Sequence, residues 1–198
     1  MPVNQPMKKQ FSLIFFGLIF VLLDPVFGGY DIIPDVLGYI LIGIGTSGLQ
    51  SYSIHFGTAR NLSWALAVFS VALLFIMGMG QLFFFSDLVV RVIDIGLIWF
   101  LLGGIRELAQ SKSREDLAKN ASQLRMLFVI LAVSTAVGVV VFKNNPAADE
   151  TFQLLVQLAI IVILVLIFIL IHRCKKHLTE EPILGPSDSA STPKPSDT

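Results

Sequence analysis

The sequence predicts an all-α fold, a polytopic membrane bundle of six transmembrane helices with the N-terminus and the C-terminus both cytoplasmic. Hydrophobic residues make up 55% of the 198 residues and charged residues only 14%, whereas soluble domains carry about 25% charged residues. The apolar residues gather in six runs, each near the roughly 20 residues that cross a bilayer. Most basic residues lie in every second connection between these runs or at the ends of the chain. This distribution is expected when the basic segments stay in the cytoplasm.

The first run covers 11–27 and resembles a signal peptide, because Lys8 and Lys9 precede it. No A-x-A-like cleavage pattern follows, and Asp24 and Pro25 come instead. We therefore expect an uncleaved first membrane helix rather than a removed peptide.

The second run covers 32–49 and is rich in small residues. Small residues let two helix backbones approach closely in a membrane, and we expect one face of this helix to do so. The predicted packing residues are Gly38, Gly43, Gly45, Ser47 and Gly48. Gly78 and Gly80 in the third run are candidates to pack against this face.

The remaining runs cover 62–85, 88–105, 126–142 and 152–171. The polar segment 106–125 has few apolar residues, so we expect a solvated connector rather than a helix lying along the membrane surface. The segment 173–198 is rich in Pro, Ser, Thr and Asp towards its end, which predicts a disordered cytoplasmic tail. The transmembrane domain then covers 1–172.

The connections test this topology. Every basic residue except Arg91 and Lys143 falls before the first run or after the second, fourth or sixth. Lys and Arg accumulate on the cytoplasmic side of membrane proteins. The pattern predicts six crossings and a multi-pass location in the cell membrane.

Polar side chains inside the runs are the candidate functional residues, and helix rise places them at similar depth in the outer half of the bilayer. They are Asp24, Asp35, Gln81, Arg91, Asp94, Gln153 and Gln157. A buried charge costs at least a few kcal/mol, so these groups should find partners. Arg91 and Asp94 lie three residues apart on one helix face, and Arg91 can also reach Asp35 or Asp24. Three interpretations stay open: an ion-pair staple between the second and fourth helices, side chains reaching the outer headgroups, and a functional pocket opening outward.

The stretch from Asp31 to Gly45, DIIPDVLGYILIGIG, resembles a segment of small uncharacterised bacterial multi-pass membrane proteins. The shared features are Asp31, the triplet Ile33-Pro34-Asp35 and the pair Gly38-Tyr39. The resemblance implies a membrane location and brings no activity with it.

Motifs of soluble enzymes are not found in the sequence. It contains no GxSxG, no HExxH, no P-loop and no dinucleotide fingerprint. We expect no catalytic residue, no cofactor and no metal site. The formal net charge is zero, which gives no reason to expect nucleic acid.

The sequence therefore predicts an integral membrane protein without catalytic activity, acting as a structural, regulatory or interaction component. The expected partners are the lipid bilayer and a second copy of the chain or another membrane protein. One alternative is a small transporter or channel subunit that uses the outward-facing polar pocket. A second alternative is an intramembrane enzyme that uses the outer-leaflet carboxylates.

Overall fold

The computed structural model describes residues 7–23, 26–27, 30–31, 35–76, 81–142 and 146–178. The elements are α1 (Met7–Leu23), β1 (Val26–Phe27), β2 (Tyr30–Asp31), α2 (Asp35–Ser47), α3 (Ile54–Ile76), α4 (Gln81–Ser111), α5 (Glu115–Phe142) and α6 (Pro146–His177). The predicted all-α class with six helices is confirmed for this part of the chain.

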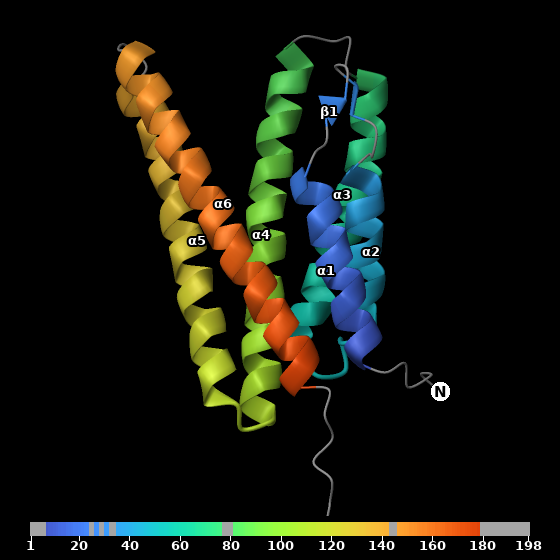
Figure 1. Ribbon diagram of the computed structural model, residues 1–198. Helices are drawn as coiled ribbons and strands as arrows, with labels where there is room; N and C mark the ends of the chain where they lie inside the picture. Colours follow the sequence, from blue (N-terminus) through green and yellow to red (C-terminus); the bar gives the residue numbers. More distant parts are fainter. Residues whose placement is uncertain are drawn as a thin grey trace, which may run out of the picture.

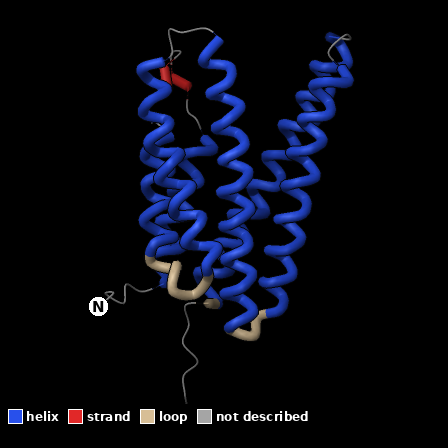
Figure 2. The backbone as a smooth tube through the Cα atoms, turned by 180° about the vertical axis from the view of Figure 1, so that it is seen from behind, coloured by secondary structure: helices blue, strands red, loops and turns tan. Residues whose placement is uncertain are grey.

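The helices run up and down in chain order, and each packs on the next (Figure 1). The last helix returns to the first, where the rings of Phe15 in α1 and Phe168 in α6 meet edge to face with centroids 5.1 Å apart. α5 and α6 lean away from the other helices towards the end that bears β1 and β2 (Figure 2). The start of α1 and the end of α6 both lie at the opposite end of the bundle.

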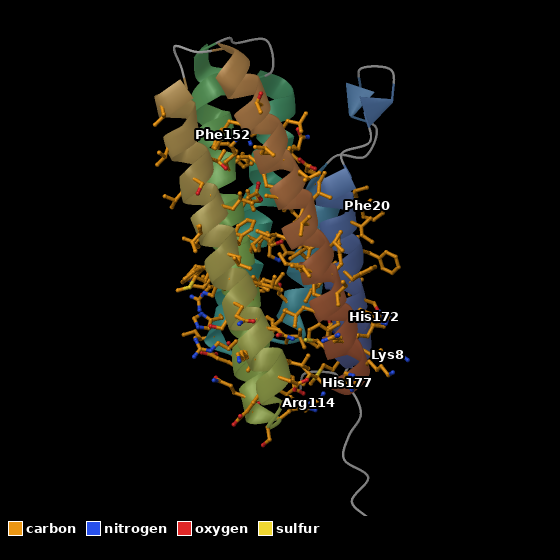
Figure 3. The ribbon with its side chains drawn as sticks, turned by 60° about the vertical axis from the view of Figure 1, so that its left-hand side comes forward. Lys8, Phe20, Arg114, Phe152, His172 and His177 are labelled. Carbon is orange, nitrogen blue, oxygen red and sulfur yellow. The ribbon has the colours of Figure 1, made fainter. Side chains whose placement is uncertain are left out.

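Among the side chains that the structure describes, the buried apolar ones concentrate towards the end where α1 begins and α6 ends. In α4, α5 and α6 they include Leu97, Leu101, Ile105, Leu108, Leu117, Leu124, Ile163, Ile167, Leu170 and Ile171. This end is also the basic end of the bundle: Figure 3 labels Lys8, Arg114, His172 and His177 there, and Phe152 near the other end.

The first helix ends earlier than its apolar run predicted. The run continues to Phe27, but α1 ends at Leu23, and Val26 and Phe27 pair with Asp31 and Tyr30 in an antiparallel hairpin. A proline at position 25 disfavours helix at the residue before it. The predicted span 11–27 is therefore wrong at its C-terminal end, and the connection between α1 and α2 contains a small hairpin.

The third predicted helix, 62–85, is also displaced. α3 covers Ile54–Ile76, and the residues from Gln81 onward belong to α4. Apolar side chains continue through this connection, so hydrophobicity alone does not mark the break. Gly78 and Gly80, the predicted packing mates of α2, lie outside the described residues.

The segment 106–125 is a helix for most of its length, which corrects the predicted solvated connector. α4 continues to Ser111 and α5 starts at Glu115. The Arg114 N–H donates to the Ala109 carbonyl at 2.8 Å, and the Ser113 N–H donates to the Gln110 carbonyl at 3.0 Å. These bonds form a Schellman motif, with Ser113 in the left-handed region at φ 55°.

The prediction missed this continuation because the helix outlasts the apolar run. Leu108, Ala109, Leu117, Ala118 and Ala121 are buried. Few apolar residues suffice here because these side chains are buried within the helix bundle. The Lys112 ammonium supports this packing by donating to the Leu178 carbonyl of the α6 end at 2.8 Å.

The sixth helix is longer than predicted at both ends. It covers Pro146–His177 instead of 152–171, so the predicted tail 173–198 begins too early. By length and composition, Leu154–His177 is the one candidate membrane span found among the described residues, and 28% of its most apolar window is buried. The remaining tail from Thr179 lies outside the described residues.

The small residues of α2 lie against two different helices. A Cβ on Gly38 would meet the Gly17 carbonyl oxygen of α1 at 2.8 Å, and one on Gly45 would meet the Gln10 carbonyl oxygen at 2.9 Å. Gly48, just beyond α2, lies against the Gln10 side chain. On the other side, a Cβ on Gly43 would lie 3.2 Å from the indole nitrogen of Trp64 in α3.

This arrangement explains the density of small residues in α2. Two neighbouring helices approach its backbone, and a larger side chain at these positions would separate them. Ser47 serves α2 itself, since its hydroxyl donates to the Gly43 carbonyl at 2.7 Å.

Candidate functional site

Three helices meet at Tyr39 through hydrogen bonds. The Tyr39 hydroxyl of α2 donates to Oδ1 of Asp94 in α4 at 2.8 Å. The Ser63 hydroxyl of α3 donates to the Tyr39 carbonyl oxygen at 2.7 Å. Tyr39 and Ser63 are fully buried. We call Tyr39, Ser63 and Asp94 the tyrosine node.

The node includes one of the predicted polar residues, and two others lie close to it. Asp35 is one helical turn before Tyr39, and its charge acts on the tyrosine hydroxyl. Arg91 is one turn before Asp94, and its charge acts on that carboxyl. The Arg91 side chain is exposed, whereas Asp94 and Asp35 are half-buried. Asp94 therefore lies between a buried tyrosine and an exposed arginine.

Among the other predicted residues of the polar cluster, the structure describes the side chain of Gln157 alone. Asp24 lies outside the described residues. Gln81 is the first residue of α4 rather than part of the third helix, and Gln153 lies near the start of α6; the structure does not describe these two side chains. Gln157 is exposed on α6, so it does not join the buried group.

The side chains of the tyrosine node are suited to a hydrogen bond that links helices. A phenolic hydroxyl is a good donor, and a carboxylate accepts strongly from it. The bond satisfies both groups in a place where water is scarce, and it connects α2 to α4 across α3. Sequence reasoning named Asp94 but missed Tyr39 and Ser63, because a tyrosine one turn inside an apolar helix has the pattern of an ordinary packing residue.

A second polar junction lies at the basic end, between α3 and α4. The Ser53 hydroxyl donates to Oε2 of Glu107, and Nε2 of His55 lies 3.2 Å from Oε1 of the same carboxylate. The Ser53 oxygen also accepts the His55 backbone N–H at 3.1 Å. Ser53 thus caps the start of α3 and joins it to α4.

The junction contains a serine, a histidine and a carboxylate, yet its geometry is not that of a hydrolase triad. In a triad the imidazole lies between the hydroxyl and the carboxylate and takes the hydroxyl proton. Here Glu107 accepts directly from Ser53 and is also the neighbour of His55, so the imidazole does not lie between the hydroxyl and the carboxylate. The capping serine could have been found from the sequence, because it directly precedes the first turn of α3.

His172, Cys174 and His177 are residue types that can bind a metal, and they lie within six residues of one another at the basic end of α6. All three lie on α6, with Cys174 buried and His172 exposed. No group of three His, Cys, Asp or Glu side chains suited to a metal ion is found among the described residues.

Comparison with known proteins adds no family assignment: no protein-family model, no curated protein and no solved structure matches this chain.

Proposed function

We propose that this protein is a multi-pass cell-membrane protein with six spans and both ends in the cytoplasm, and that it acts without catalysis as a structural, regulatory or interaction component. The resemblance of the segment from Asp31 to Gly45 to small multi-pass membrane proteins agrees with this proposal.

The main support for a membrane location is that the exposed residues of α5 change from charged to apolar along the helix. Lys119 and Arg125 lie in its first half, and the exposed residues that follow them recur every three or four positions on one helix face. They are Met126, Ile130, Val133, Val137 and Val141. A continuous apolar stripe of this length is costly in water and suits the hydrocarbon core of a bilayer.

The sixth helix extends the same apolar surface. Its exposed large apolar residues include Leu154, Leu158, Ile161, Val165 and Ile169. A soluble core helix can be equally apolar, but it would be mostly buried, and most of this window is not. The basic residues Arg173, Lys175 and Lys176 follow at its end, where cytoplasmic charge is expected.

The tyrosine node supports a non-catalytic role. The Asp94 carboxyl accepts a hydrogen bond from Tyr39 and feels the charge of Arg91. A general base would instead need an accessible proton acceptor beside a substrate. A carboxylate held between helices serves the architecture of the bundle.

Cysteine accessibility tests the six-span topology. Cys174 is replaced by alanine, and Lys119→Cys or Lys143→Cys is introduced in that background. We expect a membrane-impermeant maleimide to label K143C in intact cells and K119C only after permeabilisation. Labelling of both positions from outside, or of neither, contradicts the proposal.

A small transporter or channel subunit is the second candidate function. It is favoured by one observation: Asp94 is only half-buried and lies beside the exposed Arg91. Reconstituted vesicles loaded with a pH dye distinguish the two functions. Under the first proposal the protein adds no proton or ion flux; a flux that Asp94→Asn abolishes while the fold persists would favour transport.

A further inference from the structure

The side chain of Arg125 in α5 lies flat against α4. Its Cζ is 3.4 Å from the ring centroid of Trp99. A Cβ on Gly103 would lie 3.6 Å from Nη1 of Arg125, an ordinary contact distance, so the guanidinium lies beside this glycine. Trp99, Gly103 and Arg106 are spaced four and three residues apart, which places them on one face of α4.

Two positive charges therefore lie near each other on this face. Burial lowers the pKa of Arg125, and the neighbouring charge of Arg106 lowers it further. Arg106 is exposed and can reach a ligand at the surface. Two neighbouring guanidinium groups repel each other, and an anion placed between them would relieve that repulsion.

The protein supplies little negative charge of its own to this pair. Glu107 is the acidic residue whose charge acts on Arg125, but its oxygens are engaged by Ser53 and His55. Within the described residues neither Arg106 nor Arg125 forms an ion pair. The Nε of Arg125 is buried and makes no hydrogen bond there.

The pair lies where the basic end of the bundle meets its apolar surface. Met126 and Leu127 follow Arg125 directly, and Ile130 lies about one turn further along α5; all three are exposed. An anion with hydrocarbon chains would fit both surfaces, since its charged part meets the arginines and its chains follow α5. A soluble anion would use only the first surface.

We propose that Arg106 and Arg125, with Trp99 beneath Arg125, bind the phosphate of an anionic phospholipid at the cytoplasmic end, with the acyl chains along Met126 and Ile130. This inference rests on the proposed membrane location. Guanidinium groups recognise phosphate by paired hydrogen bonds. Basic groups between membrane helices on the cytoplasmic side commonly hold anionic headgroups.

Trp99 provides the readout, because Trp64 is the protein's other tryptophan. Full-length protein with Trp64→Phe is reconstituted in vesicles that contain either brominated phosphatidylglycerol or brominated phosphatidylcholine in an otherwise identical neutral mixture. Bromines near the headgroup end of the chains quench an adjacent indole. We expect phosphatidylglycerol to quench Trp99 at a lower mole fraction than phosphatidylcholine.

The variants Arg106→Gln and Arg125→Gln test the assignment in this background. Each should lower the preference for phosphatidylglycerol about fivefold, because each removes one of the two cationic groups that hold the headgroup beside Trp99. Arg173→Gln is the matched control, because Arg173 is an exposed basic residue at the same end of the bundle. It should leave the preference within about twofold. Circular dichroism checks that each variant is folded. If R125Q does not fold, R106Q still tests the site.

The possible results distinguish a failure of the proposed lipid site from a failure of the proposed membrane location. Equal quenching by the two lipids, or equal losses in all three variants, overturns the site. Relief of quenching by millimolar glycerol 3-phosphate shows that the pair binds soluble phosphate and overturns the lipid assignment. Quenching by neither lipid places Trp99 outside the bilayer and contradicts the proposed membrane location itself.

Discussion

The hydroxyl of Tyr39 in α2 donates a 2.8 Å hydrogen bond to the carboxyl of Asp94 in α4, a residue 55 positions away. The two helices are not consecutive, and α3 packs between them through Ser63. The two hydrogen bonds together therefore link three helices.

Tyr39→Phe should destabilise the protein by about 1 kcal/mol. The variant keeps the buried ring but leaves Asp94 without its donor, and hydrogen bonds between membrane helices contribute on this scale. The measurement is unfolding by a denaturing detergent, followed by circular dichroism. Tyr52→Phe is the control, since Tyr52 is exposed in the α2–α3 connection, and a similar loss there would argue against the node.

Gly38→Ala should cost about 1–3 kcal/mol through overpacking. The new Cβ would lie 2.8 Å from the Gly17 carbonyl oxygen and 2.5 Å from a methyl group of Val21. The carbonyl belongs to the α1 backbone, so α1 and α2 must separate. Thermal aggregation of the purified protein reports the loss.

Gly57→Ala is the matched control for that substitution. Gly57 lies in α3, and a Cβ there meets nothing within 4 Å. Alanine is the better helix former by about 1 kcal/mol, so this variant should gain stability. If both variants change stability in the same direction, the close approach of α1 and α2 is wrong.

Ser113→Gly should stabilise the α4–α5 connection by about 1 kcal/mol. Ser113 has φ 55°, a conformation that costs a side-chain-bearing residue more than it costs glycine. The comparison variant is Ser122→Gly inside α5, which should lose about 0.5 kcal/mol or less because serine is the better helix former. Differential scanning calorimetry of the two variants and the parent protein measures the changes in melting temperature, which should have opposite signs.

Glu107→Ala should loosen the junction between α3 and α4. It removes the acceptor of the Ser53 hydroxyl and the partner of His55, and a lost bond to a charged group costs about 1.5–3 kcal/mol. Hydrogen exchange should rise in the first turn of α3. Gln110→Ala, at an exposed position on the same helix, should change exchange little, and equal effects would show that the junction contributes nothing.

The sequence by itself determined the helical class and the number of helices. Both follow from apolar runs and the segregation of charge, which are local properties. Helix ends were less predictable, because a helix continues wherever its backbone bonds and tertiary contacts allow. The extension of α4 past Ile105 is an example, since Leu108 and Ala109 are buried by other helices.

Only the tertiary structure decided which polar residues meet. The sequence indicated that Asp94 needed a partner and offered Arg91, on the same face of its helix. Besides the charge of Arg91, the structure gives it the hydroxyl of Tyr39, because the rotation of α2 about its axis is set by where Gly38 and Gly45 contact α1. The same holds for Trp99 of α4, which lies beneath Arg125 of α5. Contacts between distant segments depend on the rotation and separation of whole helices, and side-chain spacing along one helix does not contain that information.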